Sequence, residues 1–157
     1  MANAKMSYQS IHGPLERATQ DDILQLYQSL FDDADVSFFI ERLKTQADVL
    51  SILAYDNDRL VGFKIGYPKS PTVFYSWIGG VLKGYRNQGI AQQLLSLQEE
   101  WVIDKGFKIL QTKSMNRFKP MMILNLKNGF DITKFYTNSK SQTKIVFEKV
   151  LKNNSSK

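Results

Sequence analysis

The chain has 157 residues and a mass of 18.1 kDa, the length of one domain that buries a core without disulfide staples. Hydrophobic residues make up 43% of it and charged residues 23%, which excludes disordered, collagen-like and membrane-spanning proteins. With no cysteine and one histidine, His12, we expect no disulfide, no thiol nucleophile and no metal. The net charge of +6 suits a polyanionic partner: nucleic acid, anionic lipid or a phosphate-rich small molecule.

The two ends of the chain, MANAKMSYQS and LKNNSSK, are polar and predict ragged termini around a body of about residues 11–151. The N-terminal stretch lacks the apolar run of a signal peptide or a membrane anchor. We therefore expect a single domain over residues 1–157, located in the cytoplasm and not bound to a membrane.

Two amphipathic helices are predicted in the first third of the chain. Thr19, with Asp22 three residues later, resembles an acidic capping box that begins the first helix. Apolar residues at helical spacing follow it: Ile23, Leu26, Tyr27, Leu30 and Phe31. After a short acidic break, Phe39, Leu43 and Ala47 lie on one face of the second helix.

Strands and two more helices are predicted in the rest of the chain. Residues 49–55 and 60–67 flank Asp56-Asn57-Asp58 and predict a β-hairpin. The further predicted strands are 73–81, 107–112, 130–137 and 144–151. A long helix follows 84–91, and a second begins near Pro120 and ends at Asn128-Gly129. With one more strand before the first helix, the predicted order is β-α-α-β-β-β-α-β-α-β-β. This order predicts an α/β domain with one mixed central sheet of about seven strands, flanked by about four helices.

The most informative segment is 81–91, VLKGYRNQGIA, in which a predicted strand turns directly into a helix. The first N–H groups of a helix have no acceptor within it, and the helix dipole adds partial positive charge there. The small residues Gly89 and Ala91 let an anion approach the backbone closely. The segment therefore predicts an anion site that suits a pyrophosphate.

Two common phosphate motifs are excluded for this segment. Gly84 and Gly89 have the spacing of a Walker loop, but Ile90-Ala91 replaces its required Lys-Ser/Thr pair. The G-x-G-x-x-G spacing of a dinucleotide fingerprint is missing. Nucleoside triphosphates and nicotinamide cofactors are therefore disfavoured.

The pattern Arg-x-x-Gly-x-Ala over residues 86–91 resembles motif A of the GNAT superfamily, the N-acetyltransferases that use acetyl-CoA. Residues 15–19 followed by 21–23 are similar to the first strand and helix of that family. Residues 121–130, which end in Gly-Phe, resemble its motif B. The element order matches from about residue 11 to 151, so the resemblance implies a GNAT-like acyl-CoA N-acyltransferase fold.

The resemblance implies acetyl-CoA (coenzyme A) as the cofactor. In this fold the fourth and fifth strands separate and the pantetheine arm fills the gap, which a bulge at Gly79-Gly80 would open. Backbone N–H groups would hold the pyrophosphate, and the side chain of Lys83 or Arg86 would meet a phosphate. The residues implied to bind the cofactor are Val81, Lys83, Arg86, Asn87, Gln88, Gly89, Ile90, Ala91, Gln92, Asn116 and Asn125.

The same resemblance implies direct transfer of acetyl from acetyl-CoA to a primary amine in a ternary complex, with the Val81 backbone N–H polarising the thioester. No general acid or base is identified. Residues 72–81 contain no carboxylate, although relatives often carry a Glu there. Asn125 stands where many relatives have a Tyr that protonates the thiolate. Tyr75, Tyr85 and Tyr136 are phenols whose placement the sequence leaves open.

The acceptor is expected to be a small-molecule or peptide amine. Asp32, Asp33 and Asp35 lie where relatives admit the acceptor, or else Asp35 caps the second helix and the other two are solvated. A rival hypothesis is a non-catalytic acyl-CoA-binding or regulatory domain on the same fold. A nucleic-acid-binding module is disfavoured, because the sequence has no RNP-like or helix-turn-helix signal. Relatives with this fold often form homodimers, but no interface is identifiable.

Overall fold

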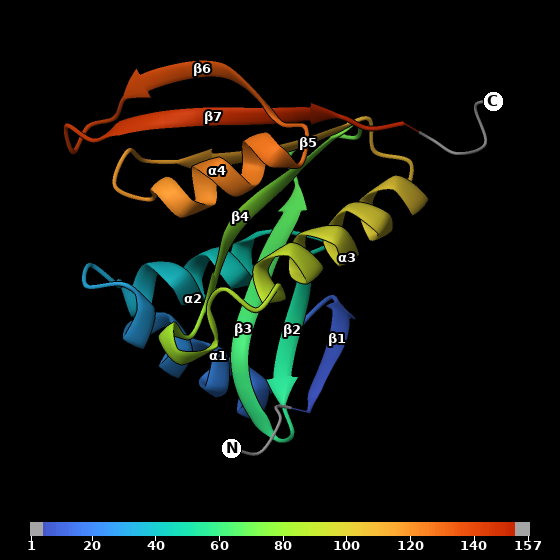
Figure 1. Cartoon of the computed structure of the whole chain (residues 1–157), viewed down its shortest axis with the longest axis vertical. Helices are drawn as coiled ribbons and strands as arrows, with labels where there is room; N and C mark the ends of the chain where they lie inside the picture. Colours follow the sequence, from blue (N-terminus) through green and yellow to red (C-terminus); the bar gives the residue numbers. More distant parts are fainter. Residues whose placement is uncertain (1–4, 153–157) are drawn as a thin grey trace. The chain divides into compact units, whose positions relative to one another are not determined.

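The computed structural model describes residues 5–152 (Figure 1). Seven strands, four α-helices and one 3-10 helix follow one another in the described chain. They are β1 (Met6–His12), α1 (Arg17–Leu30), α2 (Val36–Thr45), β2 (Leu50–Asp56), β3 (Arg59–Pro68), β4 (Val73–Val81), η1 (Lys83–Tyr85), α3 (Ile90–Asp104), β5 (Ile109–Ser114), α4 (Lys119–Lys127), β6 (Asp131–Thr137) and β7 (Thr143–Val150). The predicted order of strands and helices is confirmed.

The strand order is β1-β2-β3-β4-β5-β7-β6. Strands β1, β2 and β3 pair antiparallel, β4 pairs with β5 in parallel, and β7 pairs antiparallel with both β5 and β6. The expected mixed sheet is thereby confirmed. The chain forms two compact units, which are described separately. Unit 1 comprises residues 5–67 and 78–98, and unit 2 comprises residues 68–77 and 99–152.

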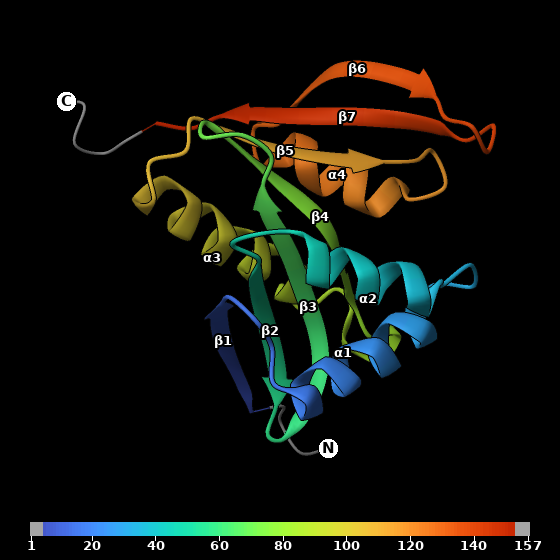
Figure 2. The same cartoon turned by 180° about the vertical axis from the view of Figure 1, so that it is seen from behind.

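The core of unit 1 lies on both faces of the β2–β3 hairpin. Figures 1 and 2, related by a half-turn, show α1 and α2 against one face and the first turns of α3 against the other. Gly62 on β3 brings α3 close, because a Cβ there would lie 3.3 Å from Ile90 and 3.4 Å from Leu94. The largest fully buried side chains of this unit include Ile23, Phe39, Leu50, Ile52, Leu53, Phe63, Ile65 and Leu94.

The start of the chain differs from the prediction. Strand β1 begins at Met6, earlier than the expected body, and residues 15–19 form no strand. Helix α1 begins at Arg17 with Glu16 as its N-cap, so Thr19 lies inside the helix and the capping-box prediction is wrong. The polar sequence of β1 is that of an edge strand, held by full pairing with β2 rather than by burial.

An aromatic part of the core of unit 2 lies on the face of its strands to which Phe74 points. The Phe74 ring meets Trp101 of α3 at a centroid distance of 5.9 Å and Phe107 at 5.5 Å. Leu110 of β5, which is in register with Phe74, and Phe147 of β7 are fully buried as well. Helix α4 has Pro120 in its first turn and is followed by Gly129 at φ +85°, as the sequence predicts. Within this unit, α4 lies against one face of β5 and β7 (Figures 1 and 2).

Candidate functional site

The end of β4 in unit 1 is shaped by two glycines. A Cβ on Gly79 would lie 2.9 Å from the carbonyl oxygen of Phe63, and one on Gly80 would lie 2.6 Å from Leu30 Cδ1. Gly79 therefore needs glycine, because the backbone of β3 approaches it this closely, whereas a side chain at Gly80 would have to displace the end of Leu30. The bulge expected at this pair stays a prediction.

The loop between β4 and α3 is held to unit 1 at three points. The Leu82 N–H donates to the Val61 carbonyl on β3 at 2.8 Å. The Arg86 side chain turns back, and its Nε donates to the Val81 carbonyl at 3.0 Å. The Tyr85 hydroxyl donates to the Asp56 carboxylate, which raises the pKa of Tyr85. These bonds fix the course of the backbone ahead of α3.

The first turn of α3 is the place where the sequence predicts an anion site. Asn87 and Gly89 have φ of +63° and +81°, and no heavy atom lies within 4 Å of the position that a Cβ of Gly89 would take. The first backbone bond of the helix runs from the Gln93 N–H to the Gly89 carbonyl, so the N–H groups of Ile90 and Ala91 precede it and have no acceptor within the helix. The N-terminus of this 15-residue helix is therefore open to an anion.

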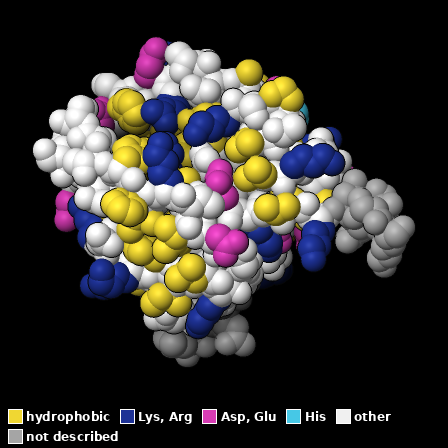
Figure 3. All heavy atoms as spheres, turned by 90° about the horizontal axis from the view of Figure 1, so that it is seen from above, with side chains coloured by type: hydrophobic (Ala, Val, Ile, Leu, Met, Phe, Trp, Pro, Cys, Tyr) yellow, Lys and Arg dark blue, Asp and Glu magenta, His cyan; other side chains and the backbone are white. Residues whose placement is uncertain are grey.

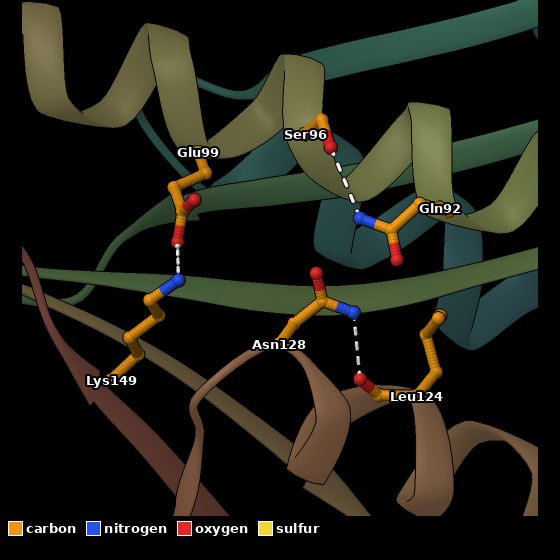
Figure 4. Close-up of polar contacts among 6 residues, drawn as sticks. All are labelled: Gln92, Ser96, Glu99, Leu124, Asn128 and Lys149. Carbon is orange, nitrogen blue, oxygen red and sulfur yellow. Dashed lines mark hydrogen bonds and ion pairs between the residues drawn. The ribbon is translucent and has the colours of Figure 1, made fainter.

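The side chains around this turn add positive charge and form hydrogen bonds within the segment. Lys83 and Arg86 are exposed beside the turn. The Gln92 side chain donates to Ser96 along the helix at 3.2 Å (Figure 4), and the Gln88 amide approaches the Gly84 carbonyl at 3.4 Å. The structure thus brings the residues predicted between Val81 and Gln92 together in unit 1.

Val81 is buried at the end of β4. Successive N–H groups along an extended strand point to opposite edges, and the Leu82 N–H points to β3. The Val81 N–H therefore points to the opposite edge of β4. In unit 2, β4 and β5 pair from Val73 to Ser76, and Thr112 Oγ1 donates to the Ser76 carbonyl at 3.0 Å.

The two predicted asparagines lie in unit 2. Asn125 is a buried residue of α4, and its carbonyl accepts from the N–H groups of Asn128 and Phe130. Asn128 also donates through its side chain to the Leu124 carbonyl at 2.8 Å (Figure 4). Asn116 is exposed in the loop before α4, where its carbonyl accepts from Lys119 Nζ at 2.7 Å.

The three aspartates before α2 have different surroundings. Asp35 is the N-cap of α2, and its Oδ1 accepts from the Phe38 N–H at 3.0 Å. The Asp35 N–H donates to the Tyr27 hydroxyl at 3.1 Å, so the cap is anchored to α1. Asp32 and Asp33 are exposed. The geometry therefore supports the capping role of Asp35.

Unit 2 holds a group of side chains that the sequence analysis did not predict to lie together. Lys113 Nζ on β5 lies 5.5 Å from the Tyr75 ring centroid and 5.3 Å from the Tyr136 ring centroid. Lys69 Nζ lies 5.9 Å from the Tyr75 ring, and Lys134 Nζ lies 5.5 Å from the Tyr136 ring. We call these five residues the Lys–Tyr cluster. The alternation of side chains along each strand can be read from the sequence. The register in which the strands pair, which aligns these residues, cannot.

The cluster changes the acidity of one phenol. Lys113 Nζ donates to the Tyr136 hydroxyl at 3.0 Å, and this bond is the main cause that lowers the pKa of Tyr136. The charges of Lys113, Lys144 and Lys69 lower it further, while partial burial opposes them. Tyr75 and Tyr136, which the sequence left unplaced, therefore belong to one electropositive surface.

Two kinds of feature are absent from residues 5–152, the part of the chain that the structure describes. No group of three or more His, Cys, Asp or Glu side chains in this part of the chain is arranged to hold a metal ion. No helix among the same residues is long and apolar enough to cross a membrane.

The sequence matches the model of the acetyltransferase (GNAT) family over residues 16–121, which is more than half of the chain and includes residues of both units. No protein of curated function matches it.

Solved structures resemble the chain at low sequence identity. Arabidopsis thaliana NAA60 in complex with a bisubstrate analogue has a TM-score of 0.75 and 15% identity, covering 96% of this chain and 100% of that one. A GNAT family acetyltransferase from Elizabethkingia anophelis with acetyl-CoA bound has a TM-score of 0.73 and 20% identity, covering 92% and 98%. The ribosomal-protein-S18-alanine N-acetyltransferase of Escherichia coli has a TM-score of 0.73 and 15% identity, covering 93% and 98%. At such identities these likenesses establish the fold.

Proposed function

This chain belongs to the acetyltransferase (GNAT) family and is an N-acetyltransferase that uses acetyl-CoA; from this premise we propose how its residues bind the cofactor and serve the transfer. The acetyl group passes directly to the primary amine of a small molecule or peptide, without an enzyme-bound intermediate. The observation that carries the proposal is the open, cation-flanked first turn of α3 directly after the end of β4.

The residues of this turn fit the pyrophosphate of coenzyme A. The left-handed backbone at Gly89 with open space around it leaves the N–H groups of Ile90 and Ala91 accessible to phosphate oxygens. Lys83 and Arg86 add two exposed positive charges. We propose that these groups, with the backbone of Asn87, Gln88 and Gln92, hold the pyrophosphate, and that Asn116 and Asn125 contact the rest of the cofactor.

Bound acetyl-CoA supplies an acetyl group activated as a thioester. The Val81 N–H, which points away from β3, donates to a carbonyl oxygen on which negative charge develops. Because a thiol has a pKa near 8.5, a thiolate leaves at neutral pH without a strong acid, so Asn125 in place of a tyrosine is compatible with turnover. β4 carries no carboxylate, so water accepts the proton of the amine in this scheme.

The acceptor class also follows as a proposal. The Escherichia coli enzyme is named for acetylating the alanine of a ribosomal protein, and the Arabidopsis thaliana structure holds a bisubstrate analogue. These names support a peptide amine as acceptor here, with a small-molecule amine as the second possibility. The geometry around Asp35 supports a capping role and lends no weight to an acceptor contact.

The first experiment is thermal unfolding with and without acetyl-CoA. Saturation at a hundred times the dissociation constant adds about 2.7 kcal/mol of stability, or roughly 5 to 10 °C in Tm for a domain of this size. Gly89→Asp places a carboxylate at the turn and should abolish the shift. Gly106→Asp is the matched control, because Gly106 also has a positive φ, +88°, with open space, but lies at the other end of α3.

Turnover is then followed as release of free coenzyme A thiol with a panel of amines. A Tm shift that is lost in Gly89→Asp and kept in Gly106→Asp, with amine-dependent thiol release, supports the proposal. A Tm shift without thiol release across the panel would favour the non-catalytic acyl-CoA-binding domain. No shift at millimolar acetyl-CoA would contradict the proposed site.

We further propose that both units form one catalytic domain, since the family match includes residues of each. The cytoplasmic location and the homodimer stay predictions. Cell fractionation tests the first, and light scattering of the purified protein tests the second.

A further inference from the structure

The Lys–Tyr cluster lies on one face of the strands of unit 2. Tyr75 is in register with Gln111 on β5, and Gln111 is in register with Glu148 on β7. Lys113 lies two residues beyond Gln111 and therefore on the same face, in register with Val146. Phe74 and Leu110 point to the opposite face, where they are buried in the core. The cluster thus occupies the face turned away from that core.

The charges on this face are unbalanced. Four ammonium groups lie on this face, those of Lys69, Lys113, Lys134 and Lys144. The face also carries two carboxylates, Glu148 and Asp131, so an excess of two positive charges remains. Glu148 Oε2 accepts from Gln111 Nε2 at 2.8 Å, and Gln111 Oε1 accepts from Lys69 Nζ at 2.9 Å. The Glu148 carboxylate is thus bound to the Gln111 amide. In the view of Figure 3, Lys and Arg side chains gather among hydrophobic ones.

The cluster is accessible and in part preorganised. Lys69 and Lys134 are exposed, whereas Lys113, Tyr75 and Tyr136 are half-buried. The two tyrosine rings hold the Lys113 ammonium in place, so little side-chain freedom remains to be lost when a ligand binds. Each ammonium carries three donors, and the cluster offers few acceptors for them.

We propose that the Lys–Tyr cluster binds a carboxylate or phosphate group, and that this group belongs to the acceptor substrate, so that the enzyme prefers amines carried by anionic molecules. The first part stands on the geometry of unit 2 alone. The second part rests on the proposed function, and on the fact that Tyr75 belongs to β4, the strand that ends at Val81.

The acceptor arm of the test uses matched amines. O-Phosphoethanolamine is compared with ethanolamine, β-alanine with its amide, and peptides with Asp or Glu at positions two and three with their Asn or Gln counterparts. The anionic member of a pair should have a KM about tenfold lower or more, as expected for one hydrogen bond between charged groups. Lys113→Met should remove this preference and leave the KM of acetyl-CoA unchanged.

Two further variants separate the anion site from general effects of charge. Lys127→Met is the matched control, because Lys127 is an exposed lysine of α4 outside the cluster. Lys134→Gln removes an exposed charge of the cluster, so it provides a second variant if Lys113→Met fails to fold.

The binding arm needs no turnover. A bound anion engages Lys113 and adds negative charge beside Tyr136, so citrate or inorganic phosphate should raise the pKa of Tyr136 saturably at constant ionic strength. The readout is the phenolate absorbance of the wild type minus that of Tyr136→Phe. Sodium chloride at equal ionic strength should leave that pKa unchanged.

The outcomes are distinguishable. An anionic preference that Lys113→Met removes and Lys127→Met retains supports the proposal. Turnover of amines without such a preference overturns its acceptor part. If acetyl-CoA binds but no amine is acetylated, the proposed function fails together with the acceptor part, and the Tyr136 titration alone decides the anion site. A Tyr136 titration that neither citrate nor inorganic phosphate changes overturns that site.

Discussion

The two adjacent glycines of β4, Gly79 and Gly80, have neighbouring atoms that differ in how easily they can move. A Cβ at Gly79 would meet the backbone oxygen of Phe63, whereas one at Gly80 would meet the mobile end of Leu30. We expect Gly79→Ala to destabilise by about 1 to 3 kcal/mol and Gly80→Ala by less, because a leucine tip moves more easily than a strand. Gly84→Ala, in open space, is the control and should be nearly neutral. Urea unfolding measures all three, and equal losses at Gly79 and Gly84 would contradict the close approach.

Lys64 is a buried charge on β3 in unit 1. Burial lowers its pKa to about 8, so between pH 8 and about 10.5 the unfolded chain binds more protons than the folded one. Stability should therefore rise with pH across that window. Lys64→Met should be more stable than the wild type at pH 7, by up to the order of 3 kcal/mol, and this advantage should shrink from pH 8 upward.

The measurement is urea unfolding of both proteins from pH 7 to pH 10. Their difference is the relevant quantity, because it removes the titration of tyrosines such as Tyr8 and Tyr55, whose pKa burial raises. An advantage of Lys64→Met that stays constant with pH would show that the ammonium is well solvated.

At the scale of elements, helix α2 depends on its first residue. Asp35 accepts the Phe38 N–H, so Asp35→Ala should cost about 1 kcal/mol of stability, and Asp35→Ser should restore most of it. Asp32→Ala, with no such bond to the helix start, is the control. Thermal unfolding measures the stability that the cap contributes. The KM of the acceptor amine measures the alternative role, a contact between Asp35 and the acceptor. If Asp35→Ser restores stability but not the acceptor KM, then Asp35 also serves the acceptor.

At the scale of the whole molecule, the two compact units raise the question of cooperativity. β4 and α3 each contribute residues to both units, so we expect the chain to unfold as one domain. Trp77 and Trp101 both belong to unit 2, whereas helices α1 and α2 belong to unit 1. Tryptophan fluorescence and far-ultraviolet circular dichroism should therefore give coincident urea transitions. Separated midpoints would mean that the units unfold independently.

The sequence by itself determined most of the helices and strands after β1, and it predicted the kind of cofactor site. Periodicity located β4 and the β2–β3 hairpin to within a residue or two, because both are bounded by strong turn residues. The strand-turn-helix at residues 81–91 was predictable for the same reason. Its anion site was predictable as well, because a helix start offers N–H groups wherever the helix packs. The family resemblance seen in these residues is confirmed by the family match.

Only the tertiary structure decided what depends on a partner distant in sequence. β1 is polar and carries a weak strand signal, and it forms because β2 offers an edge to pair with. Gly79 is required by Phe63 of another strand. The Lys–Tyr cluster contains residues of β4, β5 and β6 and Lys69 of the loop after β3. Only the pairing register of the strands brings these residues to one face. A one-residue slip would turn Lys113 to the opposite face, so no local pattern could reveal the cluster.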